Sequence, residues 1–296
     1  MNFLFGKIIY LWVQIRNLYL LLFKNAIVLS GYVDAYTFKG IRHRNWGDDL
    51  NYYWIELLTN RPVVIYQCFW LARKLKLKNY LCIGTLLDSL AYLNKSTIVW
   101  GSGISTFGHK FEQPKRICSV RGYKTKEYLK AYGIECPNII GDPALLLPKY
   151  YKPISTDKKY RLGLIPHVTD LDHQVVQEIR KKYPEILIID LAHYKKWTDV
   201  IDEICSCEVI VSSSLHGLIT SDAYGVPNCW IKLGDNVCGG INFKFLDYFS
   251  SVGRMEQNPW IVENVDDLMK AKDSLKQWKK PVIDTDSILK SCPFLK

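Results

Sequence analysis

The chain lacks several patterns that would each assign it to a class of protein. Its 296 residues contain no internal repeat, no low-complexity tract, no C-x-x-C pair and no recognisable nucleic-acid-binding motif. Apolar residues make up 48% and charged residues 23%, which excludes a disordered tail, a collagen-like fibre and a polytopic membrane protein. No uninterrupted apolar run reaches the length of about 18 residues that a membrane-spanning helix needs.

The nine cysteines form no spaced framework. An odd number without a C-x-x-C pair fits neither a disulfide scaffold nor a zinc knuckle. Most of them lie in apolar runs such as Tyr80 to Leu87. We therefore expect reduced cysteines in the core, a reducing cytoplasm and no metal site.

A formal charge of +10 requires an explanation. Such an excess suits an anionic partner, which leaves nucleic acid, a membrane surface and a phosphorylated small molecule open. The cations gather in three stretches, which are Arg73 to Lys78, Lys110 to Lys130 and Lys149 to Arg161.

Residues 1–25 predict an amphipathic helix. At 100° per residue its polar side chains share a sector about 100° wide, with Arg16 on the opposite side; they are Lys7, Gln14, Asn17, Lys24 and Asn25. No small-residue cleavage site follows clearly, which disfavours a signal peptide. Two placements stay open: the helix lies in the interface of a membrane, or it packs on the protein's own surface. We slightly favour the membrane.

Beyond residue 25 short apolar runs alternate with helical patterns, which predicts parallel sheets covered on both faces. Strands are expected at 26–33, 63–66, 80–84, 97–100, 116–120, 160–165, 186–189, 208–211 and 228–231, and helices at 49–58, 124–132, 171–182, 197–205, 215–224 and 265–278. The length favours two domains. A lysine-rich stretch with two prolines, Pro148 to Lys159, is the best linker. We expect two doubly wound α/β units that face a cleft, with domains at 26–150 and 158–262 and a C-terminal helix and tail at 263–296.

Polar clusters stand where this layout places strand ends, which is where ligands bind in such sheets. The first cluster runs from Asn45 to Asn51. Asp48 or Asp49 can cap the following helix, and Asn45 and Asp48 are also candidates for hydrogen bonding or acid/base work in the cleft. In the second, the amides of Ser102 and Gly103 can approach an anion, although a plain turn explains the glycines equally simply.

Arg121 ends another strand, with Lys124 close behind. Its planar fork suits a carboxylate or a phosphate, and a solvated charge is the alternative. Asp142 follows a further strand, where it either fixes the turn or enters the cleft. His167, at the end of the strand from Arg161 to Pro166, is a weaker candidate.

The most informative cluster runs from Val211 to Gly217. It joins a strand to a helix, and the amides of Ser213, Ser214 and Leu215 at a helix N-terminus favour an anion. His216 in the first turn is well placed to exchange protons near neutral pH.

Taken in order, these motifs resemble the polysaccharide pyruvyl transferase family over roughly Ala26 to Ile231. The resemblance rests on Asn45-Trp46-Gly47-Asp48, Trp100-Gly101-Ser102-Gly103, Val120-Arg121-Gly122, Gly141-Asp142-Pro143, Ile165-Pro166-His167, Ser213 to Gly217 and Tyr224-Gly225-Val226-Pro227. It implies two Rossmann-like domains arranged as in GT-B glycosyltransferases. It also implies transfer of a pyruvyl group from phosphoenolpyruvate to a sugar, commonly as a cyclic ketal across two hydroxyls.

The resemblance maps the family's Leu-His-Gly histidine onto His216 and its Arg-Gly arginine onto Arg121. On this reading His216 and Asp48 are catalytic, and the donor is bound by Arg121, Ser102, Gly103, Ser213, Ser214, Leu215 and Lys124, with no cofactor. The acceptor contacts Asn45, Trp46, Asp142 and His167. The family often has a basic residue where this chain has Ser214, so we expect Lys124 or Lys232 to supply that charge.

The implied acceptor is a saccharide of capsule or exopolysaccharide synthesis, linked to a polyprenyl diphosphate at the inner face of the cell membrane. Residues 1–25 would bring a cytoplasmic enzyme to it. The alternative function is a GT-B glycosyltransferase that uses a nucleotide sugar. A basic non-enzymatic protein that binds glycans or nucleic acid ranks third, and we expect no nucleic acid partner.

Overall fold

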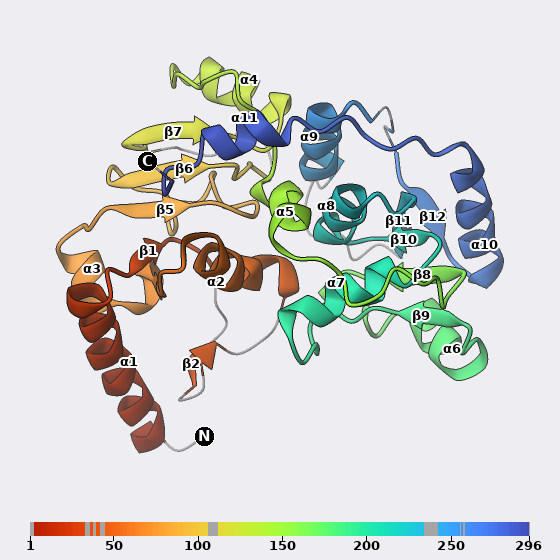
Figure 1. The fold of residues 1–296 in the computed structure, drawn as a ribbon, viewed down its shortest axis with the longest axis horizontal. Helices are drawn as coiled ribbons and strands as arrows, with labels where there is room; N and C mark the ends of the chain where they lie inside the picture. The colour runs from red at the N-terminus through yellow and green to blue at the C-terminus, as the bar shows by residue number, and fades with distance from the viewer. Residues whose placement is uncertain are drawn as a thin grey trace. The chain divides into compact units, whose positions relative to one another are not determined.

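The computed structural model describes residues 3–32, 36–37, 40–41, 45–105, 112–233, 242–254, 256 and 258–295. Val33, the last residue of the strand expected at 26–33, and Cys238, one of the nine cysteines, lie outside these ranges. The chain divides into two compact units (Figure 1). Unit 1 comprises Met1–Pro143 and Asp286–Lys296, and unit 2 comprises Ala144–Thr285. The division thus falls a few residues before the linker expected at 148–159, and the C-terminal segment returns to unit 1.

Unit 1 contains a parallel sheet of five strands in the order β4-β1-β5-β6-β7 and a short antiparallel β2-β3 pair. Its elements are α1 (Phe3–Phe23), β1 (Ile27–Leu29), β2 (Tyr36–Thr37), β3 (Gly40–Ile41), α2 (Trp46–Thr59), β4 (Val63–Ile65), η1 (Tyr66–Cys68), α3 (Trp70–Lys74), β5 (Asn79–Leu81), β6 (Thr97–Trp100), β7 (Arg116–Ser119), α4 (Tyr123–Ala131) and α11 (Thr285–Lys290).

Unit 2 contains a second parallel five-stranded sheet, in the order β12-β11-β10-β8-β9. After η2 (Pro143–Leu146) its elements are α5 (Leu147–Tyr150), β8 (Leu162–Ile165), η3 (Val168–Asp170), α6 (Gln174–Lys182), β9 (Ile186–Ile188), α7 (Trp197–Cys205), β10 (Ile210–Ser212), α8 (Leu215–Tyr224), β11 (Asn228–Leu233), α9 (Asn242–Val252), β12 (Trp260–Val262), α10 (Val265–Ser274) and η4 (Leu275–Gln277).

Both sheets confirm the predicted α/β class with parallel strands. Numbered along the chain within each unit, the strands of both sheets follow the order 2-1-3-4-5, one of the two common doubly wound orders. In such a sheet the connections change direction next to the first strand, and ligands bind beyond the carboxyl ends of the strands at that point. This switch point lies between β1 and β5 in unit 1 and between β8 and β10 in unit 2.

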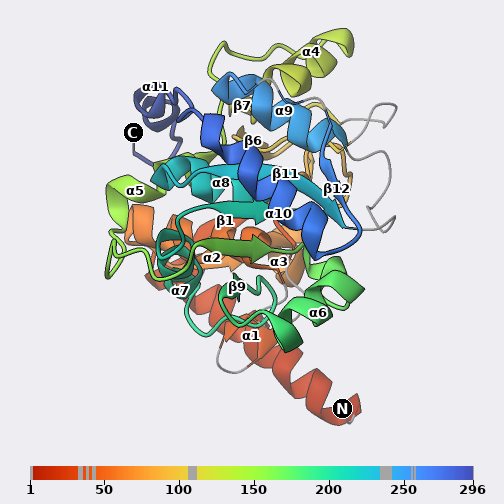
Figure 2. The same ribbon diagram turned by 90° about the vertical axis from the view of Figure 1, so that its right-hand side faces the viewer.

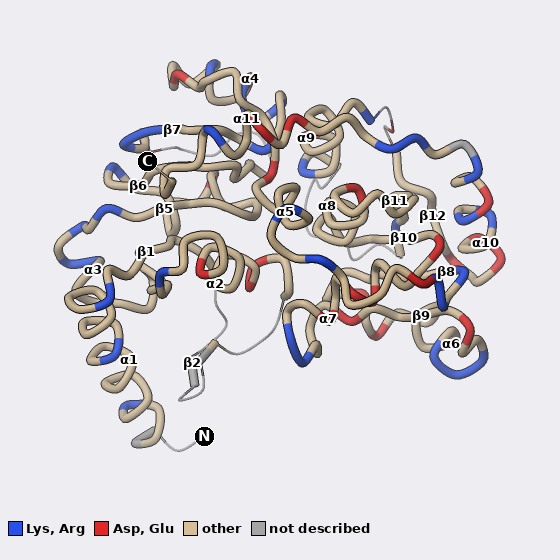
Figure 3. The backbone as a smooth tube through the Cα atoms, viewed as in Figure 1, with Lys and Arg blue, Asp and Glu red and all other residues tan. Residues whose placement is uncertain are grey.

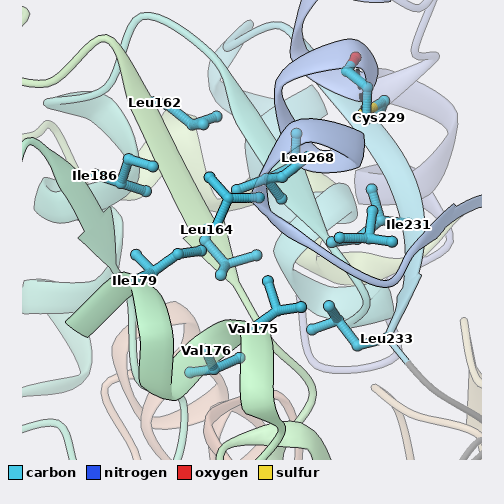
Figure 4. Close-up of a cluster of buried hydrophobic side chains, with 14 of the residues drawn as sticks. Leu162, Leu164, Val175, Val176, Ile179, Ile186, Cys229, Ile231, Leu233 and Leu268 are labelled. Atoms are coloured by element: carbon cyan, nitrogen blue, oxygen red, sulfur yellow. Dashed lines mark hydrogen bonds between the residues drawn. The ribbon is translucent and has the colours of Figure 1, made fainter. Parts of the chain in front are cut away.

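Alternation along the strands of unit 2 separates two packing faces. Leu162 and Leu164 of β8 face a core that α6 and α10 cover, and Val176 and Leu268 from these helices are fully buried there (Figure 4). Figure 2 shows α10 and α6 over this sheet. On the other face, Gly217 of α8 packs against Ile165, whose side chain points the opposite way from that of Leu164.

Helix α1 packs on unit 1 with part of its polar stripe turned inward. Gln14 bonds the carbonyl of Cys68 (2.9 Å) and the amide of Trp70 (2.8 Å), and Asn17 is fully buried. Leu20 and Leu21 join the core below β1 and β4. The opposite side carries exposed apolar residues, which include Leu11, Ile15, Leu18, Leu22 and Phe23. Helix α1 therefore packs on the protein's own surface, and it also exposes an apolar face to the outside.

None of the helices in the described part of the chain is both long enough and apolar enough to span a membrane. The eight described cysteines are all free thiols, and burial raises the pKa of several of them, among them Cys68, Cys136 and Cys205, each to about 11. These thiols act as packing residues rather than as reactive nucleophiles.

Candidate functional site

In unit 1 the start of α2 lies against the loop that follows β5. Asn45 caps the helix, because its side chain accepts a hydrogen bond from the amide of Gly47 (3.3 Å). The capping role expected of Asp48 or Asp49 therefore belongs to Asn45, and both aspartates occupy the first turn. The carboxylate of Asp48 lies next to Gly84, since a Cβ added there would be 3.6 Å from Oδ1.

Asn51 fixes α2 to this loop. Its buried side-chain amide donates to the carbonyl of Ile83 (2.8 Å) and accepts from the amide of the same residue (2.9 Å). The two hydrogen bonds satisfy the backbone N–H and C=O of Ile83 as a neighbouring strand would, although Ile83 lies beyond the end of β5. It also holds Asp48, one turn earlier on the helix, at the carboxyl end of β5.

The loops after β5 and β6 are joined at Gly84. Its carbonyl accepts from the Ser102 hydroxyl (2.9 Å) and from the Gly103 amide (3.0 Å). Both groups were predicted to bind the donor, and in this structure they hold the neighbouring loop. Donor binding by Ser102 and Gly103 stays a prediction.

Arg121, directly beyond β7, connects three strand ends. Its guanidinium donates to the Thr85 hydroxyl (2.6 Å) and to the Ile104 carbonyl (2.9 Å), and its amide donates to the Ser102 carbonyl (3.3 Å). The side chain is fully buried. In this conformation Arg121 therefore orders the loops after β5 and β6, while the donor contact expected from its planar fork stays a prediction.

The remaining unit 1 candidates surround this cluster. Trp46 and Asp142 are fully buried, so both contribute to packing in this conformation. The ring of Pro143 occupies the space beside Gly101, where a Cβ would overlap with it, and Gly101 has a φ of +88°. Lys124 is half-buried in the first turn of α4.

In unit 2 the hydroxyl of Ser213 connects the ends of β8 and β10. It donates to the Asp170 carboxylate (2.7 Å) and accepts from the His167 amide (2.9 Å). Ser212 stabilises the same turn, because its hydroxyl donates to the carbonyls of Ile165 (3.0 Å) and Ser214 (2.9 Å). The predicted residues His167, Ser213 and Ser214 thus lie together at the switch point of this sheet.

His167 is held as a neutral imidazole. Its Nδ1 is 2.7 Å from the Thr169 hydroxyl, and the ring also caps η3. Burial and the nearby Lys244 ammonium lower the pKa of His167 to about 4, and Asp170 opposes this only in part. At neutral pH the ring is therefore uncharged and can accept a hydrogen bond.

His216 lies in the first turn of α8, which has Ser214 as its N-cap residue and begins at Leu215. Gly217 allows this turn to approach β10, because a Cβ there would be 2.5 Å from the Ser212 hydroxyl. His216 is half-buried and belongs to the helix itself rather than to the preceding loop.

A buried network holds the C-terminal half of α8. Asp222, fully buried, accepts from Arg254 (3.0 Å) and from the Tyr248 hydroxyl (2.7 Å), and the Asn228 amide donates to it as well (2.7 Å). Buried charges persist when they are paired in this way. The network joins α8, β11 and α9 and so fixes the helix that carries His216.

Sequence reasoning missed Asn51, Thr85, Asp170 and Lys244. Asn51 stands inside a quoted cluster, so its position was visible in the sequence. Thr85 directly follows the strand expected at 80–84, and Asp170 follows the strand expected at 160–165 by five residues, which is a weak signal. Lys244 had no signal, because the chain from Asn242 to Val252 shows no motif and α9 was not predicted.

Comparison with known proteins supports the resemblance. The family model for polysaccharide pyruvyl transferase matches residues 38–235. An uncharacterized protein of Acanthamoeba polyphaga mimivirus is 27% identical over 259 residues, which cover 86% of this chain and 87% of that protein. The succinoglycan biosynthesis protein ExoV of Rhizobium meliloti is 29% identical over 225 residues, which cover 72% of this chain and 63% of ExoV.

The matched segment includes every strand of the two five-stranded sheets except β1 and β12, and it includes every predicted site residue, from Asn45 to His216. The chain belongs to the polysaccharide pyruvyl transferase family.

Proposed function

We propose that the chain transfers a pyruvyl group from phosphoenolpyruvate to two hydroxyls of a saccharide and forms a cyclic ketal. The observation that carries this proposal is the family match over residues 38–235. The positions of the motifs support it, since in each unit the polar residues lie at the carboxyl ends of the strands. The reaction needs no cofactor, because phosphoenolpyruvate is itself the activated donor.

The chemistry requires proton transfer and stabilisation of an anion. Protonation of phosphoenolpyruvate at C3 makes C2 electrophilic, and one sugar hydroxyl adds to C2 as a base removes its proton. Phosphate then leaves with the C–O bonding pair, and the second hydroxyl closes the ketal with loss of its proton. We assign proton transfer to His216, with Asp48 as its partner or as a sugar ligand.

Binding roles follow the same proposal. Donor contacts are assigned to Arg121 and Lys124 and to the backbone amides of the two strand-end loops, at Ser102, Gly103, Ser213, Ser214 and Leu215. Acceptor contacts are assigned to Asn45, Trp46, Asp142 and His167. Arg121, Trp46 and Asp142 are buried in this conformation, so each of them also positions the groups around it.

We also propose a lipid-linked acceptor and a cytoplasmic enzyme in peripheral contact with the inner face of the cell membrane. The exposed apolar side of α1 supports this, since no acidic residue interrupts the helix (Figure 3). An apolar helix face with cations beside it suits the interface of an anionic membrane. Such contact would bring the enzyme to a saccharide carried on a polyprenyl diphosphate.

The test is turnover by the purified full chain with phosphoenolpyruvate and candidate saccharides, followed by mass spectrometry. Ketal formation adds pyruvate less water, about 70 Da, to the acceptor. We expect His216→Ala to reduce kcat by about 100-fold or more, which is the usual loss when an acid/base group is removed. The control is His193→Ala, because the His193 side chain is exposed and belongs to none of these motifs.

Turnover by folded His216→Ala at the wild-type rate would remove this residue from the mechanism. Parallel reactions with uridine diphosphate sugars test the alternative function. Mass gain of a hexose, without any from phosphoenolpyruvate, would identify a glycosyltransferase instead.

A further inference from the structure

Unit 2 contains a small pocket of about 30 Å³ beside the strand ends already described. Its wall includes His167 and Asp170 beyond β8, Ser213 beyond β10, Lys232 of β11, and Lys244 and Phe245 of α9. Three neighbouring parallel strands thus each contribute a polar group at their carboxyl ends. The pocket also adjoins the switch point between β8 and β10, where a doubly wound sheet binds its ligand.

The charges that line the pocket favour an anion. Its lining includes two lysines, Lys232 and Lys244, and one carboxylate, that of Asp170. This carboxylate already accepts hydrogen bonds from the hydroxyls of Ser213 (2.7 Å) and Thr169 (3.2 Å). His167 adds no negative charge, and its neutral ring is close enough to Lys244 for the ammonium to affect it.

The remaining wall is apolar and rigid. Trp230 and Phe245 stack with their ring centroids 4.5 Å apart and their planes 17° apart, and both side chains are almost completely buried. A charge beside such a wall interacts more strongly with its partner, because less water screens the pair. The ammonium of Lys244 also lies 5.3 Å from the Phe245 ring centroid, which helps to keep it at the pocket.

We propose that this pocket binds the carboxylate or phosphate of the donor and that Lys244 and Lys232 are the cations that hold it. The inference rests on the proposed function for the identity of the donor. It also accounts for Ser214: Lys244 and Lys232 line the pocket that contains the adjacent Ser213, so the charge missing from the helix start is supplied from β11 and α9.

The experiment is calorimetric titration of the full chain with phosphoenolpyruvate, uridine diphosphate and inorganic phosphate. The variants are Lys244→Met and Lys232→Met, which keep a long apolar stem and remove the charge. Lys181→Met is the matched control, because Lys181 is exposed on α6 of the same unit. Lys244→Arg tests rescue by a conserved charge.

We expect the Kd for phosphoenolpyruvate to rise about tenfold to 100-fold in both Met variants, which is the usual effect of losing a charge-assisted hydrogen bond. Lys181→Met should match the wild type, and Lys244→Arg should retain most of the affinity. In turnover, the same two Met variants should raise the KM for phosphoenolpyruvate and leave the KM for the acceptor unchanged.

Equal affinity of the wild type and both Met variants for phosphoenolpyruvate would overturn the pocket assignment and leave the proposed function intact. A wild-type chain that binds uridine diphosphate but not phosphoenolpyruvate would overturn the donor and the proposed function together. Binding of inorganic phosphate alone would overturn the donor assignment in the same way.

Discussion

At the scale of single residues, the unit 1 site depends on a glycine whose side-chain space is already filled. The Arg121 guanidinium occupies the position next to Gly103, so an added Cβ would come within 3.0 Å of several of its atoms. Backbone and guanidinium cannot both stay in place if that carbon is present. The three strand ends that Arg121 connects would then lose their common partner.

We therefore expect Gly103→Ala to lower the free energy of unfolding by about 1–3 kcal/mol, the usual cost of overpacking. Equilibrium denaturation in guanidinium chloride measures it. Gly31→Ala is the control, because Gly31 in the same unit has no atom within 4 Å of the added Cβ and has no positive φ. Equal stability of the two variants would show that Arg121 moves without cost.

His167 illustrates what a residue type leaves open. Its place after a strand predicted a site residue, yet a histidine in a sequence is equally able to be charged or neutral near pH 7. Burial and Lys244 decide that it is neutral. Lys244 stands 77 residues further along the chain, so the protonation state was not accessible from local sequence.

At the scale of elements, α7 carries a carboxyl group whose ionisation opposes folding. Burial, followed by the nearby carboxylates of Asp199, Asp190 and Asp202, raises the pKa of Glu203 from 4.5 to about 7. The stabilising contribution of this group is complete below pH 4.5 and is lost as the pH rises through 7, because the folded state then has to ionise a half-buried carboxyl.

Glu203→Gln should remove this loss. We expect the Tm of the variant to exceed that of the wild type by roughly 2–4 °C at pH 8, with little or no gain at pH 5. Differential scanning calorimetry at both pH values measures it. Glu208→Gln, on the exposed surface just beyond the same helix, should show no such dependence, and a gain at pH 5 equal to that at pH 8 would rule out ionisation as the cause.

Helix α1 buries part of its polar stripe against unit 1 and leaves an apolar side exposed. Gln14 and Asn17 turn inward, where Gln14 satisfies backbone groups that α3 and its preceding turn leave open. Most of the exposed apolar side chains lie on the opposite side, in a sector about 140° wide at 100° per residue. Such a surface is a candidate for contact with lipid.

We expect the combined change Leu11→Ser, Ile15→Ser and Leu22→Ser to reduce flotation with vesicles that contain anionic phospholipid by about tenfold or more, since each side chain loses its apolar transfer energy. All three residues are exposed, so the fold should persist. The control is Ile154→Ser with Val282→Ser, which are exposed apolar residues of unit 2. Unchanged flotation of the triple variant would exclude α1 as the contact.

At the scale of the whole molecule, the two ends of the chain belong to one unit. The C-terminal segment packs on the unit 1 sheet, where the indole of Trp100 donates to the Ser291 hydroxyl (3.0 Å) and the ring of Phe294 lies 4.5 Å from that of Tyr80. Figure 1 shows α11 beside β6 and β7. Unit 1 is therefore complete only after unit 2 has been synthesised.

Phe294→Ala should destabilise unit 1 by about 1–3 kcal/mol, less than for a fully buried phenylalanine, because the side chain is half-buried. Denaturation followed by tryptophan fluorescence measures the change near Trp100. Leu295→Ala is the matched control, because Leu295 is the next residue in the chain and its side chain is exposed. Equal effects of the two substitutions would mean that the segment is not an integral part of the unit.

Much of the fold was accessible from local patterns. Apolar runs such as Thr97 to Trp100 predicted strands, since a strand buried on both faces has to be apolar throughout. Helices α7 and α8 were predicted with the bounds that the structure shows, Trp197–Cys205 and Leu215–Tyr224. The missed elements are mostly short or carry no distinct signal; they are β2, β3, α3, α5, α9, β12 and α11.

The sequence by itself determined the α/β class, the alternation of most strands and helices and the family, because hydrophobic periodicity and motif order are local properties of the chain. Only the tertiary structure decided the 2-1-3-4-5 order of both sheets, the burial of Arg121 and the convergence of Lys232 and Lys244 on one pocket. These features depend on contacts between segments far apart in the chain. The free energy of such a contact depends on the shapes and charges of both segments together, so neither segment predicts it alone.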